Sequence, residues 1–269
     1  MRMPPCRIDD PGDSRIADYA NVRDPELLRV RGLFVAEGRL VVERLLAGTT
    51  FRVRSLLLTE AAHRSLANSL SAVDSPVYVG ELALFRHIVG FNIHRGCLAL
   101  GERPADTTVT DVANGASRLV ILEDIADADN VGGVFRNAAA FGADGVLLSP
   151  RCCDPLYRKA IRTSMGAALQ VRFARFEDWP SGLSDLRAAG FQIVALTPNR
   201  DAVDLATIDR RPFRRVALLV GNEGAGLQQG TEALTDLRAA IRMRPGHDSL
   251  NVATAAAIAM HRMFTPLNL

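Results

Sequence analysis

The stretch Ile241–Phe264, IRMRPGHDSLNVATAAAIAMHRMF, changes character three times within its length. A short apolar approach leads into a Pro-Gly turn, and Ser249-Leu250-Asn251 then opens an alanine-rich run with apolar residues at helical spacing. This order predicts a strand, a polar loop and a helix. Polar side chains and unpaired backbone N–H groups at a helix mouth are suited to holding a polar small molecule. Taken alone, the stretch is better explained as a C-terminal packing helix capped by Ser249.

Upstream of this stretch, apolar segments alternate with helical patterns over residues 118–269. Their strands have continuous rather than alternating apolar character, which favours a parallel sheet buried on both faces. The fold class expected here is therefore α/β. The expected strands are 119–122, 146–148, 170–173, 192–196 and 216–220, and the expected helices are 133–141, 156–165 and 183–189.

The first part of the chain predicts a second, smaller α/β domain over residues 24–103. Residues 104–117, PADTTVTDVANGAS, hold turn formers and almost no large apolar side chain, so we expect a linker there. Residues 1–23 are polar and charged and carry Pro and Gly, which predicts a loosely held, flexible N-terminal arm.

Composition limits the possible classes of protein. The 269 residues are 48% hydrophobic, enough for a buried core, and the formal net charge of +2 neither indicates nor excludes a polyanionic partner, since a balanced total can hide a local basic face. No apolar run approaches the roughly 20 residues of a membrane span, and the N-terminus has no secretory pattern, so a cytoplasmic location is expected. The four cysteines lack paired CxxC spacing and no HExxH pair exists, so we expect no metal site.

The first glycine-bearing loop follows the apolar run LVIL and reads EDIADADNVGGVFRNA. Asn130 precedes the expected helix and Arg136 lies three to four residues inside it, so an amide and a guanidinium could converge on the helix mouth. That pair suits a phosphate or a ribose. From this segment alone the favoured alternative is structural, with Asn130 capping the helix and Arg136 paired to Asp127 or Asp129.

The second loop, in VALLVGNEGAGL, places Gly221, Gly224 and Gly226 after an apolar strand. Glycine lets a backbone approach a ligand closely, but it equally serves a tight turn. The dinucleotide pattern GxGxxG is absent, which counts against a nucleotide-dependent oxidoreductase. The third loop is the stretch quoted first, in which Ser249 and Asn251 supply polar groups and Leu250 an apolar wall.

Together and in this order, the three loops resemble the motifs of the SpoU (TrmH) family of RNA ribose 2′-O-methyltransferases, within the SPOUT class. NVGGVFRNAAAFGADGV resembles the first motif, LVGNEGAGL the second and IRMRPGHDSLNVATAAAIAMHR the third. CCDPLYRKAIRTSMGA is similar to the intervening segment, and the likeness covers about residues 118–264. More weakly, GLFVAEGRLVVERLLAG and RGCLALGERP resemble the RNA substrate-binding domain, itself similar to ribosomal proteins, that many members carry first.

The resemblance implies a catalytic domain with a C-terminal trefoil knot, binding S-adenosyl-L-methionine, in a homodimer. The polar groups expected around the reacting centre are Asn130, Arg136, Glu223, Ser249 and Asn251. Those expected at the cofactor are Leu196, Thr197, Gly221, Asn222, Gly224, Ile241, Met243 and Leu250. Two departures stand out: Arg242 replaces the proline usual after the isoleucine of the third motif, and His247 adds a titratable group in the turn.

The implied reaction aligns a ribose 2′-hydroxyl with a sulfonium methyl group. Because the pKa of a guanidinium exceeds about 12, Arg136 is expected to act electrostatically, on a phosphate or a developing alkoxide, before acting as a base. Asn130 would orient Arg136 or the ribose, while Ser249 and Asn251 would fix the third loop. Ribosomal RNA is the favoured substrate because of the N-terminal domain. The alternatives are a tRNA methyltransferase and a non-catalytic RNA-binding protein of the same fold.

Overall fold

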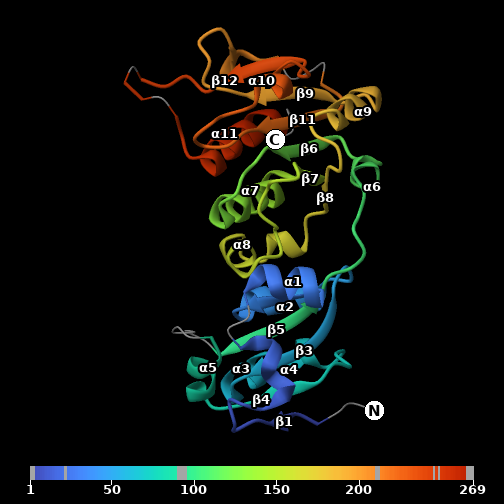
Figure 1. The fold of residues 1–269 in the computed structure, drawn as a ribbon, viewed down its shortest axis with the longest axis vertical. Helices are drawn as coiled ribbons and strands as arrows, with labels where there is room; N and C mark the ends of the chain where they lie inside the picture. The colour runs from blue at the N-terminus through green and yellow to red at the C-terminus, as the bar shows by residue number, and fades with distance from the viewer. Residues whose placement is uncertain are drawn as a thin grey trace. The chain divides into compact units, whose positions relative to one another are not determined.

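The computed structural model describes residues 4–20, 23–89, 96–209, 213–244, 246–247 and 249–264. The chain divides into two compact units, labelled by element in Figure 1. The first unit comprises Met1–Ala105 and Leu156–Gln170, and the second comprises Asp106–Pro155 and Val171–Leu269. Among the described helices, none is long and apolar enough to span a membrane.

The first unit is built on a five-stranded sheet in the order β1-β4-β3-β5-β2. Its antiparallel pairs are β2 with β5 and β3 with β5, and its parallel pairs are β3 with β4 and β1 with β4. The strands are β1 Cys6–Arg7, β2 Leu33–Glu37, β3 Arg52–Leu58, β4 Val77–Val79 and β5 Cys97–Glu102. The helices are η1 Ser14–Tyr19, α1 Asp24–Arg31, α2 Arg39–Ala47, α3 Glu60–Ser65, α4 Ala67–Leu70, α5 Leu82–Val89, α8 Arg158–Thr163 and η2 Ala167–Leu169.

The N-terminal residues 4–20, expected to be a loosely held arm, are instead part of the first unit. β1 adds a parallel strand beside β4. Ile8, Ile16 and Tyr19 are buried in the core of this unit, and the Tyr19 hydroxyl lies 2.8 Å from Ser55 Oγ. Three apolar side chains within a polar segment are enough to anchor it, because each buried one stabilises the fold by about 1.5–3 kcal/mol.

Helix α8 belongs to the first unit although its sequence lies between the motifs of the second. The expected helix 156–165 is shorter, Arg158–Thr163. The backbone N–H of Arg158 donates to Asp24 Oδ2 at 3.0 Å, and Arg44 Nη1 donates to the Met165 carbonyl at 2.7 Å. A division of the chain into consecutive domains assigns α8 to the second unit, because its partners in the first unit are more than a hundred residues away in the sequence.

The second unit is built on a seven-stranded sheet in the order β10-β12-β9-β11-β6-β7-β8, in which every pairing is parallel. The predicted α/β fold with a parallel sheet is thus confirmed. Its strands are β6 Arg118–Leu122, β7 Gly145–Leu148, β8 Phe173–Arg175, β9 Gln192–Leu196, β10 Val203–Asp204, β11 Val216–Val220 and β12 Leu237–Ala240. Its helices are α6 Val109–Ala113, α7 Ala128–Phe141, α9 Gly182–Ala188, η3 Leu205–Thr207, α10 Gln229–Glu232 and α11 Val252–Phe264.

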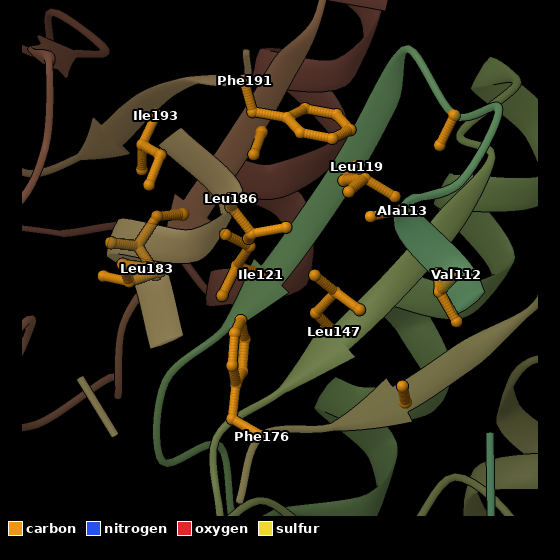
Figure 2. Packing of buried hydrophobic residues seen from close by; sticks show 14 of the residues in the cluster. Val112, Ala113, Leu119, Ile121, Leu147, Phe176, Leu183, Leu186, Phe191 and Ile193 are labelled. Atoms are coloured by element: carbon orange, nitrogen blue, oxygen red, sulfur yellow. The ribbon is translucent and has the colours of Figure 1, made fainter. Parts of the chain in front are cut away.

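One core of this unit, shown in Figure 2, joins side chains of β6, β7, α9 and β9 with those of α6. Helix α6 lies inside the expected linker 104–117, so that expectation needs correction. Thr108 and Asp111 form a capping box that starts the helix, and Val112 is fully buried in the core. Two small apolar residues on a single short turn gave too weak a helical pattern to be recognised from the sequence.

Helices α7 and α11 pack against each other. A Cβ added at Gly133 on α7 would lie 2.8 Å from the Cβ of Ala253 on α11, so the glycine is required by this close approach. Asn137 Nδ2 also donates to the Ala253 carbonyl at 2.9 Å. These contacts hold the N-terminal turn of α11 beside the middle of α7.

Candidate active site

The carboxyl ends of four parallel strands of the second unit meet at one edge of its sheet. Val220 of β11 is in register with Leu122 of β6 and with Leu196 of β9, and Leu196 is in register with Ala239 of β12. The loops that follow these strands therefore leave the sheet side by side. They carry most of the predicted site residues, as ligand sites of open parallel sheets generally do.

Three of the predicted polar residues form one hydrogen-bonded group, the Asn130–Glu223–Asn251 network. Asn130 Nδ2 donates to Glu223 Oε2 at 2.7 Å, and Asn251 Nδ2 donates to Glu223 Oε1 at 2.8 Å and to Asn130 Oδ1 at 2.8 Å. The backbone N–H of Val252 adds a bond to Glu223 Oε1 at 3.3 Å. Asn130 lies in the first turn of α7, Glu223 in the loop after β11 and Asn251 directly before α11, so the network joins the three motifs.

The two helices that enter the network are not capped as the sequence suggested. Helix α7 begins at Ala128 with Asp127 as its N-cap, whose carboxylate accepts the N–H of Asp129 and of Asn130. Helix α11 is capped by Asn251, whose Oδ1 accepts the N–H of Ala253 at 3.0 Å and of Thr254 at 3.2 Å. Ser249, the expected cap, is an exposed residue two positions earlier.

The structure does not bring Arg136 into the network. Since α7 starts at Ala128, Arg136 lies six residues past Asn130, about 9 Å along the helix axis and about 120° around it. Among the described residues, the amide of Asn130 and the guanidinium of Arg136 therefore do not converge on the helix mouth as expected. Arg136 is exposed, and in the part of the chain that the structure describes its side chain has no hydrogen bond and no ion pair, including with Asp127 or Asp129.

The glycines of the second loop serve a tight turn. A Cβ at Gly221 would lie 2.7 Å from the backbone of Gly226, which itself has a φ of +69°. Asn222 Oδ1 accepts the N–H of Gly224 at 2.8 Å, and Asn222 Nδ2 donates to the Asp124 carbonyl at 2.9 Å. The Asn222 side chain and the Gly224 N–H are therefore used within the protein, which leaves backbone carbonyls and the loop's surface for a ligand.

The remaining residues expected at the cofactor lie along the same edge of the sheet. Leu196 ends β9, and Thr197 is buried with its N–H donated to the Ala239 carbonyl. Ile241 and Met243 follow β12 and are partly buried, whereas Leu250 is 38% exposed. Apolar side chains thus border the edge on the β9 and β12 side.

Arg242 restrains the segment that follows β12. Its Nη2 donates to the Ala202 carbonyl at 2.6 Å, tying the segment after β12 to the segment after β9. A side-chain contact therefore restrains the position where a proline was expected to stiffen the backbone. His247 is exposed in the following turn, and Pro245 and Asp248 of that turn lie outside the described residues.

Two residues that sequence reasoning did not select lie at the base of the second loop. Glu123 is 1% exposed and accepts hydrogen bonds from Trp179 Nε1 at 2.7 Å, Thr231 Oγ1 at 2.5 Å and the Gln228 N–H at 3.0 Å. Its signal in the sequence is a pair of carboxylates, Glu123-Asp124, directly after the apolar run LVIL. A buried strand rarely ends in acidic residues without partners for them.

Asp124 has a φ of +55° and collects three donors. Its carboxylate accepts from Arg151, from Ser149 Oγ at 2.9 Å and from Gln228 Nε2 at 3.0 Å. Burial raises the pKa of Asp124, but these hydrogen bonds outweigh burial and hold its pKa below the ordinary value. The Asp124 carboxylate is therefore a charged group that fixes the positions of its three donors.

Within the described residues, no group of three His, Cys, Asp or Glu side chains is placed to hold a metal ion.

Known proteins are similar to this chain in sequence and in fold. The profile of the SpoU rRNA Methylase family matches residues 117–261. An uncharacterized tRNA/rRNA methyltransferase of Mycobacterium tuberculosis is 40% identical over 257 residues, covering 94% of this chain and 89% of the relative. A crystal structure of an rRNA methyltransferase from Sinorhizobium meliloti has a TM-score of 0.82 at 25% identity, covering 96% of both chains. An AdoMet-bound rRNA methyltransferase structure from the same organism has a TM-score of 0.81 at 24% identity and the same coverage.

Proposed function

The chain belongs to the SpoU rRNA Methylase family, and we propose on that premise that it transfers a methyl group from S-adenosyl-L-methionine to a ribose 2′-hydroxyl of structured RNA. The observation that carries the proposal is the Asn130–Glu223–Asn251 network. It joins the first turn of α7, which follows β6, to the segments that follow β11 and β12 at the carboxyl edge of a parallel sheet. That edge is where open α/β sheets bind their ligands.

The residues along this edge fit S-adenosyl-L-methionine. Partly buried Leu196, Ile241 and Met243 offer apolar contact to an adenosine, and the tight turn at Gly221 exposes backbone polar groups beside them. Thr197 and Leu250 extend the same border. When bound, the cofactor supplies an electrophilic methyl group on a sulfonium. The AdoMet-bound relative of similar fold supports this assignment.

The polar residues then divide the remaining work. The Asn130–Glu223–Asn251 network is fixed by its own hydrogen bonds, so it can hold the ribose without reorganising. Arg136, which is exposed and uncommitted among the described residues, binds the phosphate beside the reacting nucleotide and stabilises the developing alkoxide. Ser249 lies at the entrance to α11 and orients the third loop.

We propose ribosomal RNA as the substrate class and a domain within residues 24–103 as the part of the chain that binds it. We further propose that the protein is located in the cytoplasm. Curated relatives named tRNA/rRNA methyltransferases and solved relatives named rRNA methyltransferases support an RNA substrate. A tRNA substrate is the main alternative. A non-catalytic RNA-binding protein is the second, and the intact network counts against it.

We propose that the C-terminal part of the chain is threaded into a deep trefoil knot. Helix α11 packs on α7, β11 and β9. On another side, the Arg262 guanidinium donates to the carbonyls of Leu205, Ala206 and Ile208, at 3.4, 3.0 and 2.7 Å. Those carbonyls belong to the connection between β9 and β11, so the helix contacts that connection as well as the sheet. Chains seldom thread their own loops, and this arrangement supports one of the exceptions.

We propose that the protein acts as a homodimer. Ile258 on α11 is 40% exposed, and Ala139 and Ala140 on α7 are exposed small residues close to Arg136 in sequence. An apolar patch on the two packed helices would bring a second copy to the site. Light scattering of the purified protein checks this: a dimer mass is expected, and a monomer mass at micromolar concentration would contradict it.

The decisive experiment for the function is methyl transfer from labelled S-adenosyl-L-methionine to total RNA, followed by mapping of 2′-O-methylated ribose. Label is expected in RNA ribose at one or a few positions. Arg136→Ala should lower the rate by about a hundredfold or more while leaving the fold intact. Arg187→Ala on α9, whose surface ion pair with Asp236 is worth little stability, is the control and should keep full activity. Unchanged activity in Arg136→Ala would remove its proposed role.

A further inference from the structure

Glu123 is a buried carboxylate that the proposed reaction does not use. It follows the last residue of β6, and its backbone N–H donates to the carbonyl of Val220, the last residue of β11. With 1% of its surface exposed, its side chain cannot touch RNA or a cofactor. Three groups donate to its carboxylate instead. They are the indole N–H of Trp179, before α9, the backbone N–H of Gln228, at the N-cap of α10, and the hydroxyl of Thr231, within α10.

These contacts fix one end of the second loop, residues 221–228. The Gln228 N–H binds Glu123 Oε2 at 3.0 Å, and Gln228 Nε2 binds Asp124 Oδ2 at 3.0 Å. The other end is tied to the same dipeptide, because Asn222 Nδ2 donates to the Asp124 carbonyl at 2.9 Å. Both ends of the loop are therefore held on Glu123-Asp124.

The loop held in this way carries Glu223 in its first half, where it receives the donors of Asn130 and Asn251. A shift at the base of the loop would move Glu223 and the Gly221 turn together. Hydrogen bonds to an ionised acceptor are roughly twice as strong as neutral ones, so a carboxylate at this base restrains the loop better than an amide.

We propose that Glu123 is a positioning residue that sets the second loop for cofactor binding through Gln228 and Thr231. The inference rests on the proposed function, since it assumes that S-adenosyl-L-methionine binds beside Gly221. It assigns Glu123 no contact with the reacting atoms. Trp179 shares Glu123 Oε1 with Thr231 and so reports on the same carboxylate.

Glu123→Gln is the informative variant, because it keeps the shape of the side chain. Oε2 faces the Gln228 N–H, and Oε1 faces the Trp179 N–H. Either orientation of an amide therefore places its NH₂ group against an N–H donor. The matched control is Glu177→Gln, the same change at an exposed residue two positions before Trp179.

Calorimetry with S-adenosylhomocysteine measures the effect on the whole chain. Glu123→Gln is expected to weaken binding by about tenfold, as loss of one charge-assisted hydrogen bond would, and to raise the cofactor KM alike. The KM for RNA should stay within about twofold, as should both values in Glu177→Gln. Trp179 is the single tryptophan, so its indole N–H signal is unambiguous, and its shift with ligand should require about tenfold more ligand in Glu123→Gln than in the unsubstituted protein.

Cofactor affinity in Glu123→Gln equal to that of Glu177→Gln would overturn the proposal. If Glu123→Gln fails to fold, Thr231→Val replaces it, since this variant keeps shape and removes one donor. Binding weakened about threefold is then expected, and unchanged binding overturns the proposal. If the unsubstituted protein binds no S-adenosylhomocysteine, the proposed function itself fails, and the inference fails with it.

Discussion

Asp124 is a single residue beside the candidate site that contributes to the stability of the fold. Its backbone adopts a left-handed conformation, which Asp tolerates better than most residues, and its carboxylate accepts from Ser149, Gln228 and Arg151. The Arg151 side chain is 72% exposed, so this ion pair contributes less than about 1 kcal/mol. Most of the stabilisation therefore comes from the part-buried hydrogen bond with Ser149.

Asp124→Asn is expected to lower the free energy of unfolding at pH 7 by about 1–2 kcal/mol, because the charged acceptor is lost. The pKa of Asp124 is lowered by folding, so its contribution is present above the unfolded pKa of about 3.9 and is lost as the pH falls through the folded value. Urea unfolding at pH 7 and again near pH 3 measures this. The exposed Asp178→Asn serves as control, and a difference between Asp124→Asn and the unsubstituted protein that does not shrink at the lower pH would contradict the assignment.

At the residue scale, family motifs predicted the network better than local reasoning did. Asn130, Glu223 and Asn251 were named from the motifs, and the structure brings them together. Local reasoning made Asn130 a helix cap, because the helix was expected to begin later than it does. Asp127 is the N-cap instead, because α7 begins at Ala128 and the Asp127 carboxylate accepts N–H groups of its first turn. Asn130 is 93 residues from Glu223 and 121 residues from Asn251 in the sequence, and no local pattern encodes contacts over such separations.

At the element scale, the contact between α7 and α11 depends on a glycine. Gly133→Ala would favour an isolated helix by up to about 1 kcal/mol, yet its Cβ would lie 2.8 Å from that of Ala253. We expect the overlap to prevail and to cost about 1–3 kcal/mol of the free energy of unfolding. Ala253→Gly in the same chain should restore part of the loss, which a double-mutant cycle in urea measures.

Gly230→Ala is the control for this change. Gly230 lies in helix α10, and a Cβ there would meet no atom within 4 Å. This variant should be neutral or slightly stabilising. A destabilisation equal to that of Gly133→Ala would show that the contact with Ala253 is not the cause.

Four strands of the second unit, β6, β7, β9 and β11, were predictable from the sequence. Strand β8 lies at Phe173–Arg175 instead of the expected 170–173, and β10 and helix α6 were not expected. Strands such as Val216–Val220 are fully buried, so an unbroken apolar run marks them in the sequence. Helix α6 and the N-terminal segment are held by a few apolar side chains, such as Val112 and Ile16, in otherwise polar sequence. Their structure depends on tertiary burial, which periodicity does not record.

At the scale of the whole molecule, the first unit is discontinuous. Residues 156–170 pack on β2 and α2 through α8 and the turn after it, where Gly166 lies against Arg44 and Val41. A polypeptide of residues 1–105 should therefore be less stable than one in which a Gly/Ser linker joins 1–105 to 156–170. Urea unfolding of the two polypeptides measures the difference. Equal stability would contradict the placement of α8, and Ile161→Asp in the linked form should remove the gain.

The hydrogen bond between Asn130 and Asn251 joins residues 121 positions apart, with Asn251 the later one. At about 5–20 residues per second, synthesis reaches Asn251 roughly 6 to 24 seconds after Asn130. During that interval the nascent chain already has β6 and α7 but lacks the partner that closes the network. The Asn130–Glu223–Asn251 network therefore cannot close until Asn251, at the start of α11, has been synthesised.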